Sequence, residues 1–207
     1  ILENTAHSQD PARSLEALVL TPTRELALQV CSHIRAVVEA GGCFANVAAI
    51  CGGMSVQKQE RVLLQHGGAH IVVATPGRLW DMIKHDDALA LRVRRTRFLV
   101  IDEADRMIEA GHFAEMDLLL QMVRRTKGAA ADANPDMQTF VYSATMSKAL
   151  QTNLKRALWR KKQRREAEPS NTLDDLLARV DFRDAEPVVI EMATQRHVAD
   201  TLYEAKM

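Results

Sequence analysis

The sequence is short of cysteine, of net charge and of long apolar runs, and each shortage excludes a class of protein. Its three cysteines, Cys31, Cys43 and Cys51, match neither a zinc-site spacing nor a disulfide framework, which favours a reducing compartment. Lys plus Arg and Asp plus Glu number 27 each, so any attraction to a nucleic acid or a membrane has to be local. No signal peptide is present, and no apolar run is long enough to span a bilayer.

Histidine is scattered as well, because the seven His residues form no His-Glu-x-x-His pattern, and we interpret them as surface or packed residues. What the chain does have is a length of 207 residues, 47% of them hydrophobic, which suits one large α/β domain with a proper core. It begins with Ile1 rather than Met, and we expect it to be a piece of a longer chain.

Short apolar runs alternate with stretches of helical periodicity. The runs predict strands at 17–20, 46–51, 70–74, 98–101, 139–142 and 187–190. Helices are predicted from 24 to the glycines at 41–42, from 56 to the glycines at 67–68, and, as a short helix, from after 78 through 83. Further helices are predicted at 106–125 with a break at Gly111, from 147 onward, and at 173–180. We expect Pro22 in the first turn of the first helix, and Ser55 as the cap of the second. This order predicts a three-layer α/β fold, a mostly parallel sheet with helices on both faces.

One predicted strand, in the stretch RFLVIDEAD at 97–105, ends in carboxylates. A carboxylate pair at the carboxyl end of a buried strand suits a hydrated Mg²⁺, which binds through one or two carboxylates plus substrate phosphates. Asp102 would hold the ion, mainly through its waters, and Glu103 would orient or polarise an attacking water. The alternative is that Asp102, Glu103 and Asp105 only favour a helix N-terminus.

Three other predicted strands are followed by residues that suit phosphate oxygens, through backbone N–H groups, hydroxyls and guanidinium groups. They are Thr23, Arg24, Gly52, Gly53, Thr75, Gly77 and Arg78. Because ligands of open α/β sheets bind beyond the carboxyl ends of the strands, we expect all these loops along one edge, gripping a nucleic-acid backbone without reading bases. The alternative for each loop is ordinary turn chemistry.

Two further features have open interpretations. Ser143 and Thr145 end the strand after the acidic one, and their hydroxyls either hydrogen-bond Asp102 or Asp105 or cap the next helix. A basic run with a Trp at 155–165 either contacts RNA, acts as a nuclear-import patch, or is a solvated helix face. Trp80 and Met107 are expected to pack in the core.

Taken together, these motifs resemble the DEAD-box ATP-dependent RNA helicases. PTRELA at 22–27, the glycine pair at 52–53, TPGR at 75–78, DEAD at 102–105 and SAT at 143–145 occur in the order of that family. The resemblance covers about 17–189 and implies the first RecA-like (P-loop NTPase-like) domain. The stretches GGMSVQKQ, TPGRLW and DEADRM, with His112 between Gly111 and Phe113, resemble in particular the nucleolar branch that acts in large ribosomal subunit maturation.

The resemblance implies ATP and Mg²⁺ as cofactors and RNA as the partner. It implies catalysis by Glu103 and Asp102, with Mg²⁺ held by Asp102 via water, and coupling of ATP to RNA through Asp105, Ser143, Ala144 and Thr145. RNA would be bound by Pro22, Thr23, Arg24, Gly52, Gly53, Thr75, Pro76, Gly77 and Arg78, and its 2′-hydroxyl would distinguish it from DNA. The RNA would be a ribosomal RNA precursor, with pre-ribosomal proteins as further partners, no membrane partner, and a place in the nucleus and nucleolus, with the cytoplasm or mitochondrion as alternatives.

The sequence departs from the family by lacking the phosphate loop Gly-x-x-x-x-Gly-Lys-Ser/Thr, the glutamine motif and a second RecA-like domain. Without these parts we expect the 207 residues alone to hydrolyse ATP negligibly and to bind RNA weakly. We expect 1–14 to be a loop or loose end, 15–193 a partial RecA-like domain 1, and 194–207 the start of a linker. The alternatives to a helicase are a non-catalytic RNA-binding scaffold and a DNA-directed or other P-loop ATPase.

Overall fold

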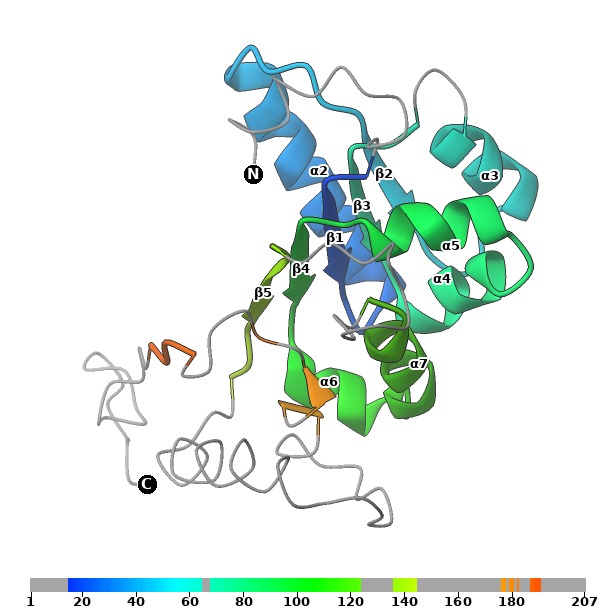
Figure 1. Ribbon diagram of the computed structural model, residues 1–207. Helices are drawn as coiled ribbons and strands as arrows, with labels where there is room; N and C mark the ends of the chain where they lie inside the picture. Colours follow the sequence, from blue (N-terminus) through cyan, green and yellow to red (C-terminus); the bar gives the residue numbers. More distant parts are fainter. Residues whose placement is uncertain are drawn as a thin grey trace, which may run out of the picture.

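The computed structural model describes residues 15–64, 68–123 and 136–144, together with 176–177, 179–180, 182 and 187–190. At its centre is a sheet of five strands (Figure 1). The strands are β1 (Ala17–Leu20), β2 (Val47–Ile50), β3 (Ile71–Ala74), β4 (Phe98–Ile101) and β5 (Gln138–Val141). All neighbouring pairs are parallel, in the order β2-β3-β1-β4-β5. The predicted parallel sheet is confirmed.

Helices follow the strands along the chain. They are α2 (Arg24–Ala40), α3 (Val56–Leu64), α4 (Pro76–Ile83), α5 (Asp87–Arg94), α6 (Ala104–Glu109) and α7 (Phe113–Val123). The predicted break between α6 and α7 is confirmed, because Gly111 has a φ of +77°, a conformation that side chains rarely adopt. No helix among the described residues has the length and apolar character needed to cross a membrane.

Strands β1 to β4 bury both faces, which is why their sequences are wholly apolar, whereas the edge strand β5 is half-buried and contains Gln138 and Thr139. In β1, Leu18 and Leu20 face the cluster built with α3 to α7, whereas Ala17 and Val19 face the cluster built with α2. Figure 1 shows α2 on one side of the sheet and α3, α4, α5 and α7 on the other. The three-layer arrangement is therefore also confirmed.

Several local predictions differ from the structure. Pro22 does not lie in the first turn of α2, because Thr23 is the N-cap and Pro22 precedes it. Helix α5 was not predicted, since its buried side is only Leu89, Ala90 and Val93, among many charges. The strand predicted at 187–190 is wrong, because these residues form no strand pairing within the described part of the chain.

The predicted helix at 173–180 is described only in part. Leu176 and Val180 are buried in the cluster around α7, and the Arg179 Nη1 to Asp117 Oδ1 distance is 2.7 Å. This segment therefore packs back onto α7. The basic run at 155–165 and the helix predicted from 147 lie outside the described residues. Met107 is buried as expected, and Trp80 packs half-buried against the same core.

Candidate functional site

The loops that follow the five strands begin at one level along the carboxyl edge of the sheet. The N–H groups of Thr75, Thr21, Asp102 and Tyr142 donate to the last carbonyl of the neighbouring strand at 3.0, 2.9, 2.9 and 2.8 Å. With the observed strand order, the loops therefore run 51–55, 75–78, 21–24, 102–105 and 142–144 along this edge. The three loops with glycine, threonine and arginine are contiguous, and the acidic loop comes next.

Arg24 and Gly53 join two of these loops directly. Gly53 has a φ of +73°, and a Cβ added there would overlap the Nη1 of Arg24. The guanidinium group of an otherwise exposed arginine thus lies on the backbone of the β2 loop. The left-handed conformation favours a glycine at 53, and a Cβ there would also displace the Arg24 guanidinium.

Gly52 and Gly77 are different, because the fold does not explain why they are glycine. Neither has a φ in the left-handed region, and no atom lies within 4 Å of a Cβ added at either position. Both lie beside the edge described above, where a backbone without side chains lets another molecule approach closely.

Arg78 lies on the same part of the edge as Arg24. Burial raises the pKa of the Cys51 thiol, while the charges of Arg24 and Arg78 lower it. Both guanidinium groups therefore act on the end of β2, although they start from α2 and α4. This edge carries two cations within reach of the same loop.

The threonines and prolines of these loops cap helices or are buried, and so they fix the backbone of the loops. The Thr23 hydroxyl oxygen accepts the Leu26 N–H at 3.2 Å, so Thr23 caps α2. Thr75, Pro22 and Pro76 are buried, and Pro76 is the first residue of α4. Thr23 therefore has a local role as the N-cap of α2, which agrees with the ordinary turn chemistry given as the alternative for its loop.

Glu103 has a strained backbone at the end of the acidic strand. It has a φ of 47° and a ψ of 52°, and among the described residues it is the one residue other than glycine with positive φ. Such conformations cost energy and cluster at functional sites. Its carboxylate pairs with Arg106 at 3.2 Å, a partner that the sequence alone did not reveal although it lies one helical turn further on.

Asp102 is a half-buried carboxylate without an ion pair to any described residue. Burial raises its pKa, the Glu103 N–H that it accepts at 3.0 Å lowers it, and the Glu103 charge raises it. A desolvated negative charge of this kind fits a cation held through water. No group of three metal-ligating side chains gathers in the described part of the chain.

The β5 loop lies beside the acidic one. The Ala104 N–H donates to the Tyr142 carbonyl at 3.0 Å, which ties the start of α6 to the end of β5. Ser143 is half-buried and Ala144 is exposed, whereas Thr145 lies outside the described residues. The hydrogen bonds predicted from Ser143 and Thr145 to the acidic loop stay a prediction.

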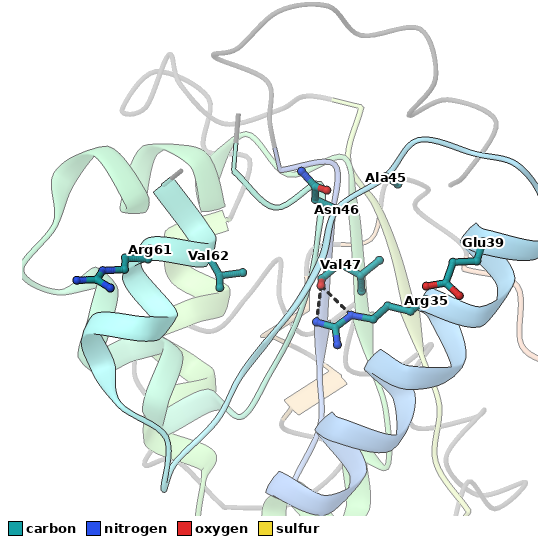
Figure 2. Close-up of a pocket in the computed structure, with 7 residues that line it drawn as sticks. All are labelled: Arg35, Glu39, Ala45, Asn46, Val47, Arg61 and Val62. Atoms are coloured by element: carbon teal, nitrogen blue, oxygen red, sulfur yellow. Dashed lines mark hydrogen bonds between the residues drawn. The ribbon is translucent and has the colours of Figure 1, made fainter. Parts of the chain in front are cut away.

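A cavity of about 450 Å³ lies at the other end of the edge strand β2, between α2 and α3. Figure 2 shows Arg35 reaching from α2 to the Val47 carbonyl, with donor distances of 3.1 and 2.8 Å. Since Val47 begins β2 and Gly52 follows its end, this cavity is separate from the carboxyl edge.

A parallel sheet in this strand order, with its polar loops along the carboxyl edge, defines a RecA-like α/β domain. The structure is similar to that of Mss116p bound to ssRNA and AMP-PNP, with a TM-score of 0.59 and 24% identity over 73% of this chain and 28% of that chain. It is also similar to the yeast DEAD-box splicing factor Prp28, with a TM-score of 0.56 and 31% identity over 69% of this chain and 31% of that chain.

The family follows from the sequence comparison. Residues 1–152 match the family model described as DEAD/DEAH box helicase, and the chain belongs to that family. It is 43% identical to the ATP-dependent RNA helicase DDX24 of Mus musculus, over 95% of this chain and 22% of that protein. It is 37% identical to the ATP-dependent RNA helicase mak5 of Aspergillus fumigatus, over 91% of this chain and 25% of that protein. The chain thus spans about a quarter of the length of these relatives.

Proposed function

We propose that this chain is part of an ATP-dependent RNA helicase, which separates RNA strands or remodels RNA–protein complexes while hydrolysing ATP. The observation that carries the proposal is the order of loops along the carboxyl edge, where three contiguous loops suited to phosphate lie beside one acidic loop. This arrangement lets one domain hold an RNA backbone and a metal-bound nucleotide at neighbouring positions.

The RNA side consists of the loops after β2, β3 and β1. Gly52 and Gly77 leave open space for a sugar-phosphate backbone, and Arg24 and Arg78 supply charge-assisted hydrogen bonds to its phosphates. Gly53, Thr23, Thr75, Pro22 and Pro76 shape these loops. Contacts of this kind bind without reading base sequence, and the 2′-hydroxyl would provide the choice of RNA over DNA.

The nucleotide side is the acidic loop. Asp102 would hold Mg²⁺ through its waters, because its half-buried charge has no cationic partner among the described residues. When bound there, the ion would neutralise negative charge on the phosphate groups of ATP. Glu103, held in its strained conformation, would orient the attacking water and accept its proton.

Communication between the two sides would use Asp105 with Ser143, Ala144 and Thr145. The bond from the Ala104 N–H to Tyr142 supports this role, because it ties the acidic helix to the β5 loop. A shift of α6 on ATP hydrolysis would then displace the β5 loop and, along the same edge, the loops that bind RNA.

We further propose a role in ribosome biogenesis, on a ribosomal RNA precursor and with pre-ribosomal proteins, in the nucleolus. The support is the His112 that separates Gly111 from Phe113 and the resemblance of the surrounding motifs. We propose residues 15–193 as part of RecA-like domain 1, preceded by a loose segment at 1–14 and followed by linker from 194. The described core, from β1 to the segment around Val180, falls inside this range.

The test is RNA-stimulated ATP hydrolysis by the intact protein that contains this chain. Glu103→Gln should lower the rate roughly 10²- to 10⁴-fold, the usual contribution of a general base, while leaving RNA binding intact. Glu109→Gln, an exposed acid on the same helix, is the matched control and should keep the wild-type rate. Equal rates in Glu103→Gln and wild type would contradict the catalytic assignment and favour an RNA-binding scaffold.

The RNA side is tested separately with Gly77→Ala. Because Gly77 lies in α4 with open space around an added Cβ, Gly77→Ala should fold with an equal or slightly higher melting temperature. A methyl group facing the RNA backbone should nevertheless weaken single-stranded RNA binding. Fluorescence anisotropy with labelled RNA and, in parallel, the same DNA sequence measures both affinity and the choice of nucleic acid. Wild-type affinity for RNA in Gly77→Ala would contradict the proposed RNA edge.

A further inference from the structure

Gln59 is a buried amide directly beneath the Gly52–Gly53 loop. It lies on α3 and is 2% exposed. Its Nε2 donates to the Cys51 carbonyl at 2.9 Å and to the Met54 carbonyl at 3.3 Å. These two carbonyls lie on either side of the glycine pair, so one side chain ties both ends of the loop.

The orientation of the Gln59 amide follows from these contacts. Turning it over would bring its oxygen against two carbonyl oxygens, so the nitrogen must face the loop. The Oε1 atom is then buried and accepts no hydrogen bond from any described residue. Leaving an acceptor unsatisfied costs stability. What this amide supplies, and an apolar side chain of its size does not, is the pair of bonds to the loop.

Few other contacts hold this loop. Within the described chain, no other hydrogen bond reaches the carbonyls of residues 51–54. The remaining contacts are the Cys51 Sγ to Met54 Sδ approach at 3.7 Å, the Arg24 guanidinium on Gly53, and the packing of Cys51 and Met54 in the apolar cluster around α2. The orientation of the loop's carbonyl groups therefore depends on Gln59 from the inside, while Arg24 lies on its outer side.

We propose that Gln59 is a positioning residue for RNA binding, which holds the Gly52–Gly53 loop at the height where its backbone meets the RNA phosphates. Gln59 itself is buried and does not contact RNA. This inference rests on the proposed function of the same edge. Loss of the two bonds should let the loop move, so RNA affinity falls while the nucleotide side is unaffected.

The experiment uses the intact protein with single-stranded RNA and compares Gln59→Met with Gln57→Met. Gln57 is an exposed glutamine on the same helix and is the matched control. Gln59→Met should raise the RNA concentration for half-maximal ATP hydrolysis roughly fivefold to thirtyfold, the effect of one or two ordinary hydrogen bonds. The rate at saturating RNA should not change, and the fall in melting temperature should be small, because the unsatisfied Oε1 is removed together with the two bonds. Gln59→Glu, which keeps the size but places oxygens against the two carbonyls, should give a larger shift.

The outcomes separate the two proposals. Wild-type RNA dependence in both Gln59 variants, or a parallel fall of RNA affinity, saturating rate and melting temperature, would overturn the positioning role. Gly77→Ala in the same assay reports on the edge itself. A shift in Gly77→Ala without one in Gln59→Met removes only this inference, whereas no shift in either removes the proposed RNA edge.

Discussion

Alanine at Gly53 and alanine at Gly52 should have different consequences, although the two glycines are adjacent. Gly53 has a φ of +73°, whereas the φ of Gly52 lies outside the left-handed region. A left-handed conformation costs a residue with a Cβ about 1–2 kcal/mol. At about 2–4 °C per kcal/mol for a domain of this size, Gly53→Ala should lower the melting temperature by roughly 2–8 °C.

Gly53→Ala should also weaken RNA binding, because the new methyl group would displace the Arg24 guanidinium. This side chain is flexible and can move at little further cost to stability. Loss of one charge-assisted hydrogen bond to a phosphate corresponds to roughly tenfold to hundredfold in affinity. Gly52→Ala should leave the melting temperature unchanged, since nothing lies within 4 Å of the added Cβ, and should still weaken RNA binding.

Calorimetry of the intact protein and anisotropy with single-stranded RNA at one fixed salt concentration measure the two effects. The salt concentration matters because phosphate contacts depend steeply on it. An equal fall of melting temperature in both variants would refute the reasoning from backbone conformation. Wild-type RNA affinity in both would refute the reasoning from the open edge.

Two further predictions concern ionisable groups. Burial raises the pKa of Asp102, so the charged carboxylate destabilises the fold as pH rises through that pKa. Asp102→Asn should therefore raise the melting temperature at neutral pH, and it should abolish ATP hydrolysis. The gain should shrink as pH falls toward the range where the carboxyl is protonated, and a variant that melts lower than wild type at neutral pH would contradict it. His70 accepts the Asn46 N–H at 3.0 Å, and its pKa is lowered by burial and by Arg92, against Glu16, which raises it. The contribution of neutral His70 to stability is therefore full above the unfolded pKa of about 6.5 and is lost as pH falls below it. Part of the decline in melting temperature between pH 7.5 and 5.5 should accordingly vanish in His70→Asn. A decline of the same size in His70→Asn and wild type would count against this.

Strand positions were predictable because a strand covered on both faces needs a nearly continuous apolar run, as in β1 and β4. The same local pattern gave a wrong prediction of a strand at 187–190, where Val188 is 88% exposed and no strand pairs with it in the described chain. A strand exists only where a neighbour supplies hydrogen bonds, which periodicity does not contain. Helix α5 escaped prediction because its three buried residues form too narrow an apolar stripe.

At the candidate site, residue types were predictable and contacts were not. Gln59 stood in the sequence as one more position on a helix face, and a polar residue on the inner side of α3 was the signal available for its role. The contact between Arg24 and Gly53 and the pair of Glu103 with Arg106 depend on side-chain directions across different turns or strands. The first could not be read from spacing, whereas the i,i+3 spacing of Glu103 and Arg106 was a signal that the prediction did not use.

By itself, the sequence determined that parallel strands carry phosphate-type and acidic loops at their carboxyl ends, because burial and turn chemistry are local. Only the tertiary structure decided which loops are neighbours, since the order β2-β3-β1-β4-β5 arises from how α2 and the helices of the other face pack. It also decided the left-handed conformation of Glu103, which depends on hydrogen bonds to strands on both sides of β4.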